Sequence, residues 1–157
     1  MTLNKSARKV QETLEAAGCN FTVQELGSST RTAQDAADSI GCKVEQIVKS
    51  LIFKGKESSK PVLILASGPN RVNEKLVAKT LGEKLAKADA DFCRKVTGFA
   101  IGGIPPIGHQ EKLTTFIDKD LLKHKEVWAA AGTPNAVFRL ESSRLPELTA
   151  GVVTEVH

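Results

Sequence analysis

The order of apolar and polar residues in the first third of the chain predicts two short helices separated by a strand. Apolar residues recur with helical spacing over residues 3–17, and Gly18 follows as a residue that commonly ends helices. Residues 21–26, FTVQEL, alternate like a strand with one buried face. Thr32 precedes a second helical pattern, with Asp35 three residues later. A threonine in that position is typical of a helix N-cap.

The middle of the chain predicts a β-hairpin followed by two helices. A short helical turn at 44–48 runs into a strand around 50–54, and the apolar run KPVLILASG follows at 60–68. Such a continuous run is typical of a strand buried on both faces. Because only the polar GKESSK separates the two strands, we expect them to pair as a hairpin. Helical patterns at 72–82 and 89–98 each end at a glycine.

The C-terminal part predicts short strands joined by short helices. Strands are expected at 99–103, 114–118, 127–132, 136–140 and 151–156, and helices at 119–125 and 143–150. No repeat, low-complexity tract or long linker interrupts the chain, so one domain over residues 1–157 is expected. The strands are too many for a helical bundle and do not alternate regularly with helices. This pattern favours an α+β domain in which helices flank a mixed, curved sheet.

Composition and charge narrow the classes of function. Aromatic residues make up 4% of the chain, with no Tyr and one Trp, which argues against a nucleic-acid platform built on several rings. The net charge of +4 is compatible with a polyanionic partner but does not demand one. The first eighteen residues lack an apolar signal-peptide core, and the apolar run at 62–66 is too short to span a bilayer. A cytoplasmic location without membrane association is expected.

Cysteine content and spacing argue against a disulfide framework and against a zinc site. Cys19, Cys42 and Cys93 are odd in number, widely separated and without a CxxC pair, which is typical of reduced thiols. The GxSxG, HExxH and P-loop motifs are absent. We therefore expect neither a metal nor a cofactor. An enzyme that uses Cys93 or Cys42 as nucleophile stays open as a hypothesis, and it predicts inactivation by alkylation.

The most unusual stretch is FAIGGIPPIGH, residues 99–109, which is very apolar and rich in glycine and proline. Gly102 and Gly103 can adopt positive φ and leave room for a ligand, while Pro105 and Pro106 fix φ and remove two N–H groups. A stiff loop of this kind could direct backbone N–H groups at the negative charge that develops on an ester oxygen. The alternative is a tight corner that needs these residues for geometry alone.

Two further stretches carry candidate binding residues, each with a simpler alternative. Lys49 precedes the apolar LIF, where it could hold an anionic group in a pocket or extend to solvent. Ser67, Asn70 and Arg71 lie near the start of a helix, where phosphate can bind. The alternative is that Asn73 only caps this helix. Four lysines form a basic segment that is most simply a solvated face: Lys112, Lys119, Lys123 and Lys125.

Several of these stretches, in this order, resemble the YbaK / prolyl-tRNA-synthetase-associated domain family. The resemblance covers nearly the whole chain and rests on SSTRTAQDAA, QIVKSLIFKG, PVLILASGPNRVNEKL, VTGFAIGGIPPIGH and AAAG. VTGFAIGGIPPIGH contains the family's GxxxP loop as Gly102 to Pro106, and QIVKSLIFKG supplies the family's lysine as Lys49. The resemblance implies a partly closed, barrel-like sheet around a pocket. It also implies hydrolysis of mischarged aminoacyl-tRNA, commonly tRNA for proline, by a freestanding trans-editing protein.

The resemblance also implies roles for individual residues and partners. Catalysis would depend on Lys49 and on five residues of the loop: Gly102, Gly103, Ile104, Pro105 and Pro106. A second group would bind substrate or tRNA: Thr30, Ser67, Asn70, Arg71, Gly108 and His109. The expected partners are the acceptor end of aminoacyl-tRNA and prolyl-tRNA synthetase or elongation factor, and the expected passengers are Ala, Ser, Thr or Cys. A non-catalytic module that binds aminoacyl-tRNA or the synthetase is the alternative function.

Overall fold

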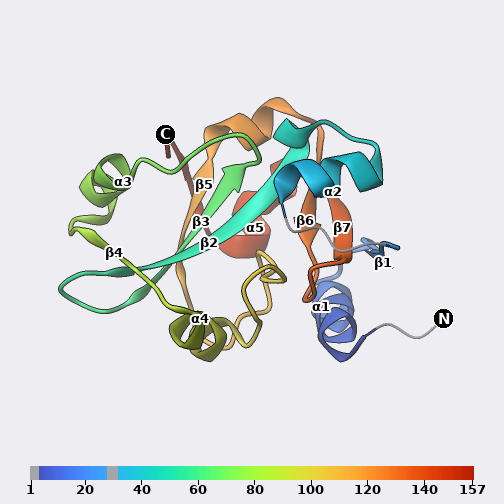
Figure 1. The fold of residues 1–157 in the computed structure, drawn as a ribbon, viewed down its shortest axis with the longest axis horizontal. Helices are drawn as coiled ribbons and strands as arrows, with labels where there is room; N and C mark the ends of the chain where they lie inside the picture. The colour runs from blue at the N-terminus through green and yellow to red at the C-terminus, as the bar shows by residue number, and fades with distance from the viewer. Residues whose placement is uncertain (1–3, 28–31) are drawn as a thin grey trace.

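The computed structural model describes residues 4–27 and 32–157, which fold around one mixed eight-stranded sheet (Figure 1). The strands are β1 (Val23–Glu25), β2 (Ile47–Gly55), β3 (Pro61–Ser67), β4 (Leu85–Lys87), β5 (Thr114–Asp118), β6 (Glu126–Ala130), β7 (Ala136–Glu141) and β8 (Val152–Thr154). Their order is β1-β7-β6-β2-β3-β5-β8, with β4 paired to β2 off this path. β2 and β3 run obliquely to β5, β6 and β7 in Figure 1, so the sheet is strongly twisted.

Short helices flank the sheet, which confirms the predicted α+β class. They are α1 (Lys5–Ala16), α2 (Ala33–Ile40), α3 (Glu74–Leu81), α4 (Ala90–Thr97) and α5 (Leu145–Thr149), with 3-10 turns at Val44–Gln46, Lys119–Lys123 and Ser142–Arg144. Thr32 caps α2 as predicted, because its hydroxyl accepts a hydrogen bond of 3.0 Å from the N–H of Asp35. The helices α2, α3 and α4 each end at a glycine, which is also the predicted stop.

Strand β3 forms the centre of the core and is buried on both faces, as its continuous apolar sequence predicts. It pairs antiparallel with β2 and parallel with β5. Leu63 and Leu65 pack into the larger apolar cluster, which includes residues of α1 and α4. Val62 and Ile64 pack on the opposite face with Val77 of α3. Because β3 is enclosed in this way, its neighbour β2 is held rigidly along one edge.

One local expectation needs correction, and one short strand was not expected. The strand expected at 99–103 is a turn, in which the N–H of Gly103 donates to the carbonyl of Ala100 at 3.1 Å. Gly102 has φ of +97°, which a strand does not accommodate. The sequence also gave no sign of β4, whose three residues are too few for a readable alternation and which forms by pairing with Phe53–Gly55.

The sheet has a gap along the second edge of β2. On that edge β2 pairs with β6 only at Ile47 and Val48, and with β4 only from Phe53 onward. Between these two points the strand has no partner there among the described residues. The loop after α4 lies below this gap in Figure 1, between α4 and the β6–β7 hairpin. The gap therefore opens a cavity in the middle of the sheet.

Candidate functional site

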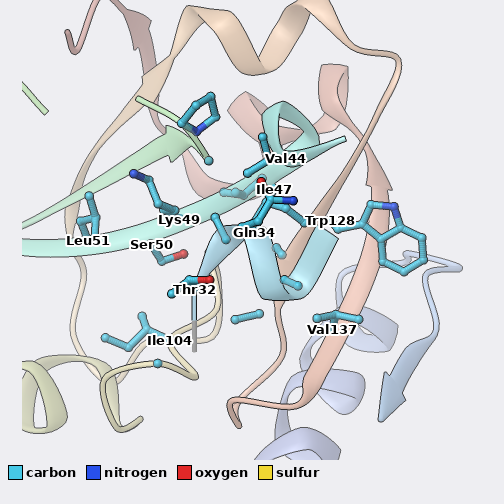
Figure 2. A pocket seen from close by; sticks show the side chains of 18 of the residues that line it. Thr32, Gln34, Val44, Ile47, Lys49, Ser50, Leu51, Ile104, Trp128 and Val137 are labelled. Carbon is cyan, nitrogen blue, oxygen red and sulfur yellow. The ribbon is translucent and has the colours of Figure 1, made fainter. Parts of the chain in front are cut away.

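A cavity of about 650 Å³ lies at this gap and is bounded by β2, β6, α2 and the loop after α4 (Figure 2). Three of the residues that the sequence singles out line it: Lys49, Gly102 and Ile104. Its walls are mainly small or aliphatic side chains, among them Ala129, Ala130 and Val137. The cavity is large enough for a small organic group and is mostly apolar, as binding sites for such groups usually are.

Lys49 is the charged side chain that lines the cavity, and it is held in place by the backbone of a distant loop. Its Nζ donates to the carbonyl oxygen of Asn70 at 2.6 Å. Partial burial lowers the pKa of the Lys49 ammonium, Asp118 opposes that shift, and Arg71 adds to it. The lysine is therefore neither fully solvated nor paired with a carboxylate, so it keeps hydrogen-bonding capacity for an anionic ligand.

Asp118, which the sequence did not single out, organises the loop that holds Lys49. It is fully buried at the end of β5. Its Oδ2 accepts from the backbone N–H of Ser67 at 3.0 Å and from Nδ2 of Asn70 at 2.7 Å, and its Oδ1 accepts from the N–H of Asp120 at 2.9 Å. The sequence contains one sign of this role. An aspartate ends the apolar segment TTFID, and a carboxylate that is buried there needs hydrogen-bond partners.

Among the residues expected to bind substrate or tRNA near the start of α3, Ser67 has a structural role, and the expected binding roles stay predictions. The Ser67 hydroxyl is buried and donates to the carbonyl of Glu45 at 2.7 Å. Asn73 accepts a hydrogen bond from the N–H of Leu76 at 3.1 Å, so the alternative of a simple helix cap is confirmed for α3. Arg71 is exposed and has no ion pair within the described ranges. None of these side chains lines the cavity.

The glycine-proline loop is fixed by close contact with the turn between β6 and β7. The N–H of Gly132 donates to the carbonyl of Gly103 at 2.8 Å. A Cβ on Gly103 would lie 2.7 Å from the carbonyl oxygen of Gly132, so only glycine fits there. The N–H groups of Gly102 and Ile104 have no acceptor among residues 4–27 and 32–157. The loop thus presents two free donors next to the cavity.

The residues that follow Ile104 in the loop do not line the cavity but pack against the part that does. Pro105 and Pro106 are buried and do not line the cavity. The Nε2 of His109 lies 2.6 Å from the carbonyl oxygen of Pro105. Burial lowers the pKa of His109, the contact with Pro105 opposes that shift, and Lys9 adds to it. His109 therefore braces the loop as a neutral ring at neutral pH.

Of the two remaining candidates, the structure describes one. Gly108 has φ of +81° and lies near Thr13 of α1, away from the cavity. Thr30 lies outside the described residues. Their expected roles in binding stay predictions.

Other cavity residues could not be read from local motifs. Ala33 and Gln34 of α2, Ser50 of β2 and Trp128 of β6 all line the cavity. They come together only through the pairing of β2 with β6, in which Ile47 aligns with Trp128, and through the packing of α2 on these strands. That alignment depends on the tertiary fold, so sequence spacing gave no indication of it.

One cluster has the residue types of a metal site. Ligand atoms of Asp118, Asp120 and His157 lie within 4.8 Å of one another. Their charge is already compensated within the protein, because Asn70 donates to both carboxylates, and Lys123 and His157 contact Asp120 at 2.9 and 2.8 Å. We therefore interpret the cluster as the hydrogen-bonded support of Asn70.

The basic segment and the cysteines contribute little to the cavity. Lys119 pairs with Glu155 at 2.8 Å, so part of the basic charge of this segment is neutralised.

The cysteine thiols are unfavourable nucleophiles. Burial raises the pKa of the Cys42 thiol and, together with Asp89, that of the Cys93 thiol. Neither cysteine lines the cavity. A thiol with a raised pKa is a poor nucleophile, which argues against the thiol-enzyme hypothesis.

Comparison with known proteins assigns this chain to a class. The chain superimposes with a TM-score of 0.93 on the crystal structure of a candidate trans-editing enzyme for prolyl-tRNA synthetase, at 45% identity over 99% of this chain and 98% of that one. The class is that of aminoacyl-tRNA deacylases, enzymes that hydrolyse the ester between an amino acid and its tRNA. The chain belongs to the aminoacyl-tRNA editing domain family, whose profile matches residues 28–148. The family resemblance inferred from the sequence is thereby confirmed.

Two curated relatives place the domain in different contexts. The chain is 39% identical over 94 residues to the proline–tRNA ligase of Limosilactobacillus fermentum, a match that covers 57% of this chain but 16% of the ligase. It is 25% identical over 126 residues to the candidate Cys-tRNA(Pro)/Cys-tRNA(Cys) deacylase EbsC of Enterococcus faecalis, covering 80% of this chain and 76% of that protein. None of the helices in the described ranges is long and apolar enough to cross a membrane.

Proposed function

We propose that this domain hydrolyses the ester bond of mischarged tRNA for proline and acts in the cytoplasm. The observation that carries the proposal is the cavity at the gap of β2, which is lined by Lys49 and by the loop residues Gly102 and Ile104. The candidate trans-editing enzyme and the proline–tRNA ligase that this chain resembles support the choice of tRNA.

The two kinds of binding group lie on different sides of β2, and this suggests how the substrate is oriented. In Figure 2 the Lys49 side chain extends from one side of the strand, while Ile104 and its loop lie on the other side. The ammonium of Lys49 suits the terminal phosphate or ribose of the tRNA, since it is a compact point charge. The loop then faces the aminoacyl group.

In the proposed reaction a water molecule attacks the carbonyl carbon of the aminoacyl ester. The N–H groups of Gly102 and Ile104 stabilise the negative charge that develops on the carbonyl oxygen. The bond between that carbon and the ribose oxygen then breaks. The proton that the attacking water loses passes to the ribose oxygen that leaves, and the free amino acid and an uncharged tRNA are released.

In this proposal no general base comes from the protein, because a hydroxyl of the terminal ribose positions the water and relays its proton. The polar side chains that line the cavity within the described ranges are those of Thr32, Gln34, Lys49 and Ser50, with the indole of Trp128 at its side. None of these is a carboxylate, an imidazole or a thiol, which are the usual bases in proteins. A substrate hydroxyl that positions the water meets this need.

The walls of the cavity favour a small passenger amino acid: alanine, serine, threonine or cysteine. Ala129 and Ala130 of β6 and Ile104 of the loop are apolar, so the part of the cavity that they line suits a small, uncharged side chain. A hydrophobic pocket separates amino acids that differ by one methylene by only about 1–3 kcal/mol, so a synthetase benefits from a second selection step. Prolyl-tRNA synthetase or elongation factor would deliver the charged tRNA.

A deacylation panel tests the proposal. tRNA for proline is charged separately with alanine, serine, threonine, cysteine and proline, and the loss of each ester is followed with and without the protein. Selective hydrolysis of one or more of the small non-cognate esters, unchanged after alkylation with iodoacetamide, is the expected result. Binding of charged tRNA with no hydrolysis of any ester would instead support a non-catalytic binding module.

A further inference from the structure

The hydroxyl of Ser50 is a buried polar group without a partner. Ser50 follows Lys49 in β2, and its Oγ has no contact with solvent and no hydrogen bond within the described residues. It is the one side-chain oxygen or nitrogen in residues 4–27 and 32–157 with both properties. Buried hydroxyls in proteins are nearly always hydrogen-bonded, so an exception at a cavity wall indicates that a ligand supplies the partner.

The side chain of Ser50 lies on the side of β2 where the loop faces the cavity. Successive residues of a strand point to opposite faces, and Figure 2 shows Lys49 and Ser50 extending from opposite sides of the ribbon. The Ser50 hydroxyl is directed toward the side on which Ile104 lies. Ile104 and Val137 supply apolar walls there. Ser50 and Thr32 are thus the labelled polar side chains among apolar walls on this side, and a ligand reaches the enclosed hydroxyl of Ser50 once that side chain rotates toward the cavity.

The backbone of Ser50 also faces the cavity. The N–H of Gly55 donates to the carbonyl of Lys60 at 2.9 Å, which fixes the alternation of hydrogen bonds between β2 and β3. By this alternation Lys49 bonds to β3, and the N–H and C=O of Ser50 point to the other edge. That edge is the gap between the β6 pairing, which ends at Val48, and the β4 pairing.

We infer that Ser50 is a specificity-determining residue whose hydroxyl hydrogen-bonds the side-chain hydroxyl of a seryl or threonyl ester. The inference rests on the proposed function and names its substrate class, the esters of β-hydroxy amino acids. An alanyl group of similar size would leave the Ser50 hydroxyl unpaired. Sites with a buried hydrogen-bonding group reject analogues that cannot pair with it.

The α-ammonium of the substrate is a less suitable partner for this hydroxyl. An ammonium carries a charge and three donors, and its transfer to apolar surroundings needs several acceptors. Among the described residues no carboxylate lines the cavity, and the cavity already holds the ammonium of Lys49. A neutral hydroxyl needs only one partner, so the amino acid side chain fits better.

The test compares seryl, threonyl and alanyl esters of tRNA for proline in the full chain. Ser50→Ala should lower kcat/KM for the seryl and threonyl esters about tenfold and leave the alanyl ester unchanged or faster. Ser50→Thr, which keeps the hydroxyl, should retain the preference for serine over alanine. Ser142→Ala is the matched control, because the Ser142 hydroxyl is buried and partnered by the carbonyl of His124, outside the cavity.

A binding measurement separates this inference from the proposed function. Analogues of the aminoacyl-adenosine end, with a stable amide in place of the ester, are titrated against the fluorescence of Trp128, the single tryptophan of the chain, which lines the cavity. Tighter binding of the seryl analogue than of the alanyl analogue, lost in Ser50→Ala, supports the role of Ser50 even if no ester is hydrolysed. Equal losses for seryl and alanyl substrates, no loss for either, or no binding of either analogue would each overturn it.

Discussion

Replacement of Gly103 by alanine should destabilise the whole domain, because the loop meets the β6–β7 turn backbone to backbone. The new Cβ would lie 2.7 Å from both the carbonyl carbon and oxygen of Gly132 and 2.8 Å from Cα of Thr133. Real Cβ atoms do not approach backbone atoms so closely, so the two segments must separate. Their separation stretches the hydrogen bond of 2.8 Å from the N–H of Gly132 to the carbonyl of Gly103.

The expected loss of stability has two causes, the close contact of the new Cβ and the stretched hydrogen bond. Overpacking of this kind costs about 1–3 kcal/mol, and a lost hydrogen bond costs about 1 kcal/mol. Gly103→Ala should therefore lower the free energy of unfolding by about 2–4 kcal/mol. Gly102→Ala places its Cβ 3.7 Å from Pro134 and suffers only the strain of φ near +97°, about 1–2 kcal/mol. Gly27→Ala, with nothing within 4 Å and no positive φ, should be nearly neutral.

Equilibrium unfolding in urea measures all three variants under the same conditions. The order of stability should be Gly27→Ala, then Gly102→Ala, then Gly103→Ala, with the slope in urea unchanged. If Gly103→Ala is as stable as Gly102→Ala, the close packing of loop and turn is refuted. The result would also show that Gly132 does not hold the loop in place.

Two further variants test how the site is supported. Asp118→Asn removes the charge that raises the pKa of Lys49. The alkaline limb of the pH profile of kcat/KM should therefore move to lower pH. If the limb does not move, the role of Asp118 is purely structural. Burial holds the pKa of His109 below its ordinary value of 6.5. At a pH below 6.5 the native state therefore binds fewer protons than the unfolded state, and the native state loses stability as the pH falls. His109→Gln should flatten the decline in unfolding free energy between about pH 7 and pH 5, and an equally steep decline in the variant would contradict this cause.

The elements that the sequence predicted are those whose signals are local. The continuous apolar run of β3, the polar turn that joins it to β2 and the Thr32 cap all lie within a few residues of the structure they specify. Lys49 and Gly102 were found because they belong to short motifs. The strand expected at 99–103 was wrong because the apolar pattern was outweighed by the positive φ of Gly102 and the contact with the β6–β7 turn.

The parts of the site that were missed depend on contacts between distant segments. Asp118 supports Asn70 from 48 positions away. Ser50 is notable only because β2 loses its partner at the gap, and Trp128 lines the cavity only because β6 aligns with β2. No spacing rule connects these residues. Of these residues, only Asp118 has a local signal in the sequence, because its charge lies at the end of an apolar strand.

The most direct test of the central claim is the single-turnover rate of ester hydrolysis in Lys49→Met. Lys54→Met is the matched control, because Lys54 lies on the same strand, rests 5.4 Å from the ring centroid of Phe92 and does not line the cavity. If Lys49 orients the tRNA end in the cavity, its loss should slow hydrolysis about 100-fold or more, while Lys54→Met keeps the wild-type rate. Wild-type hydrolysis by a folded Lys49→Met protein would contradict the assignment of this cavity as the deacylation site.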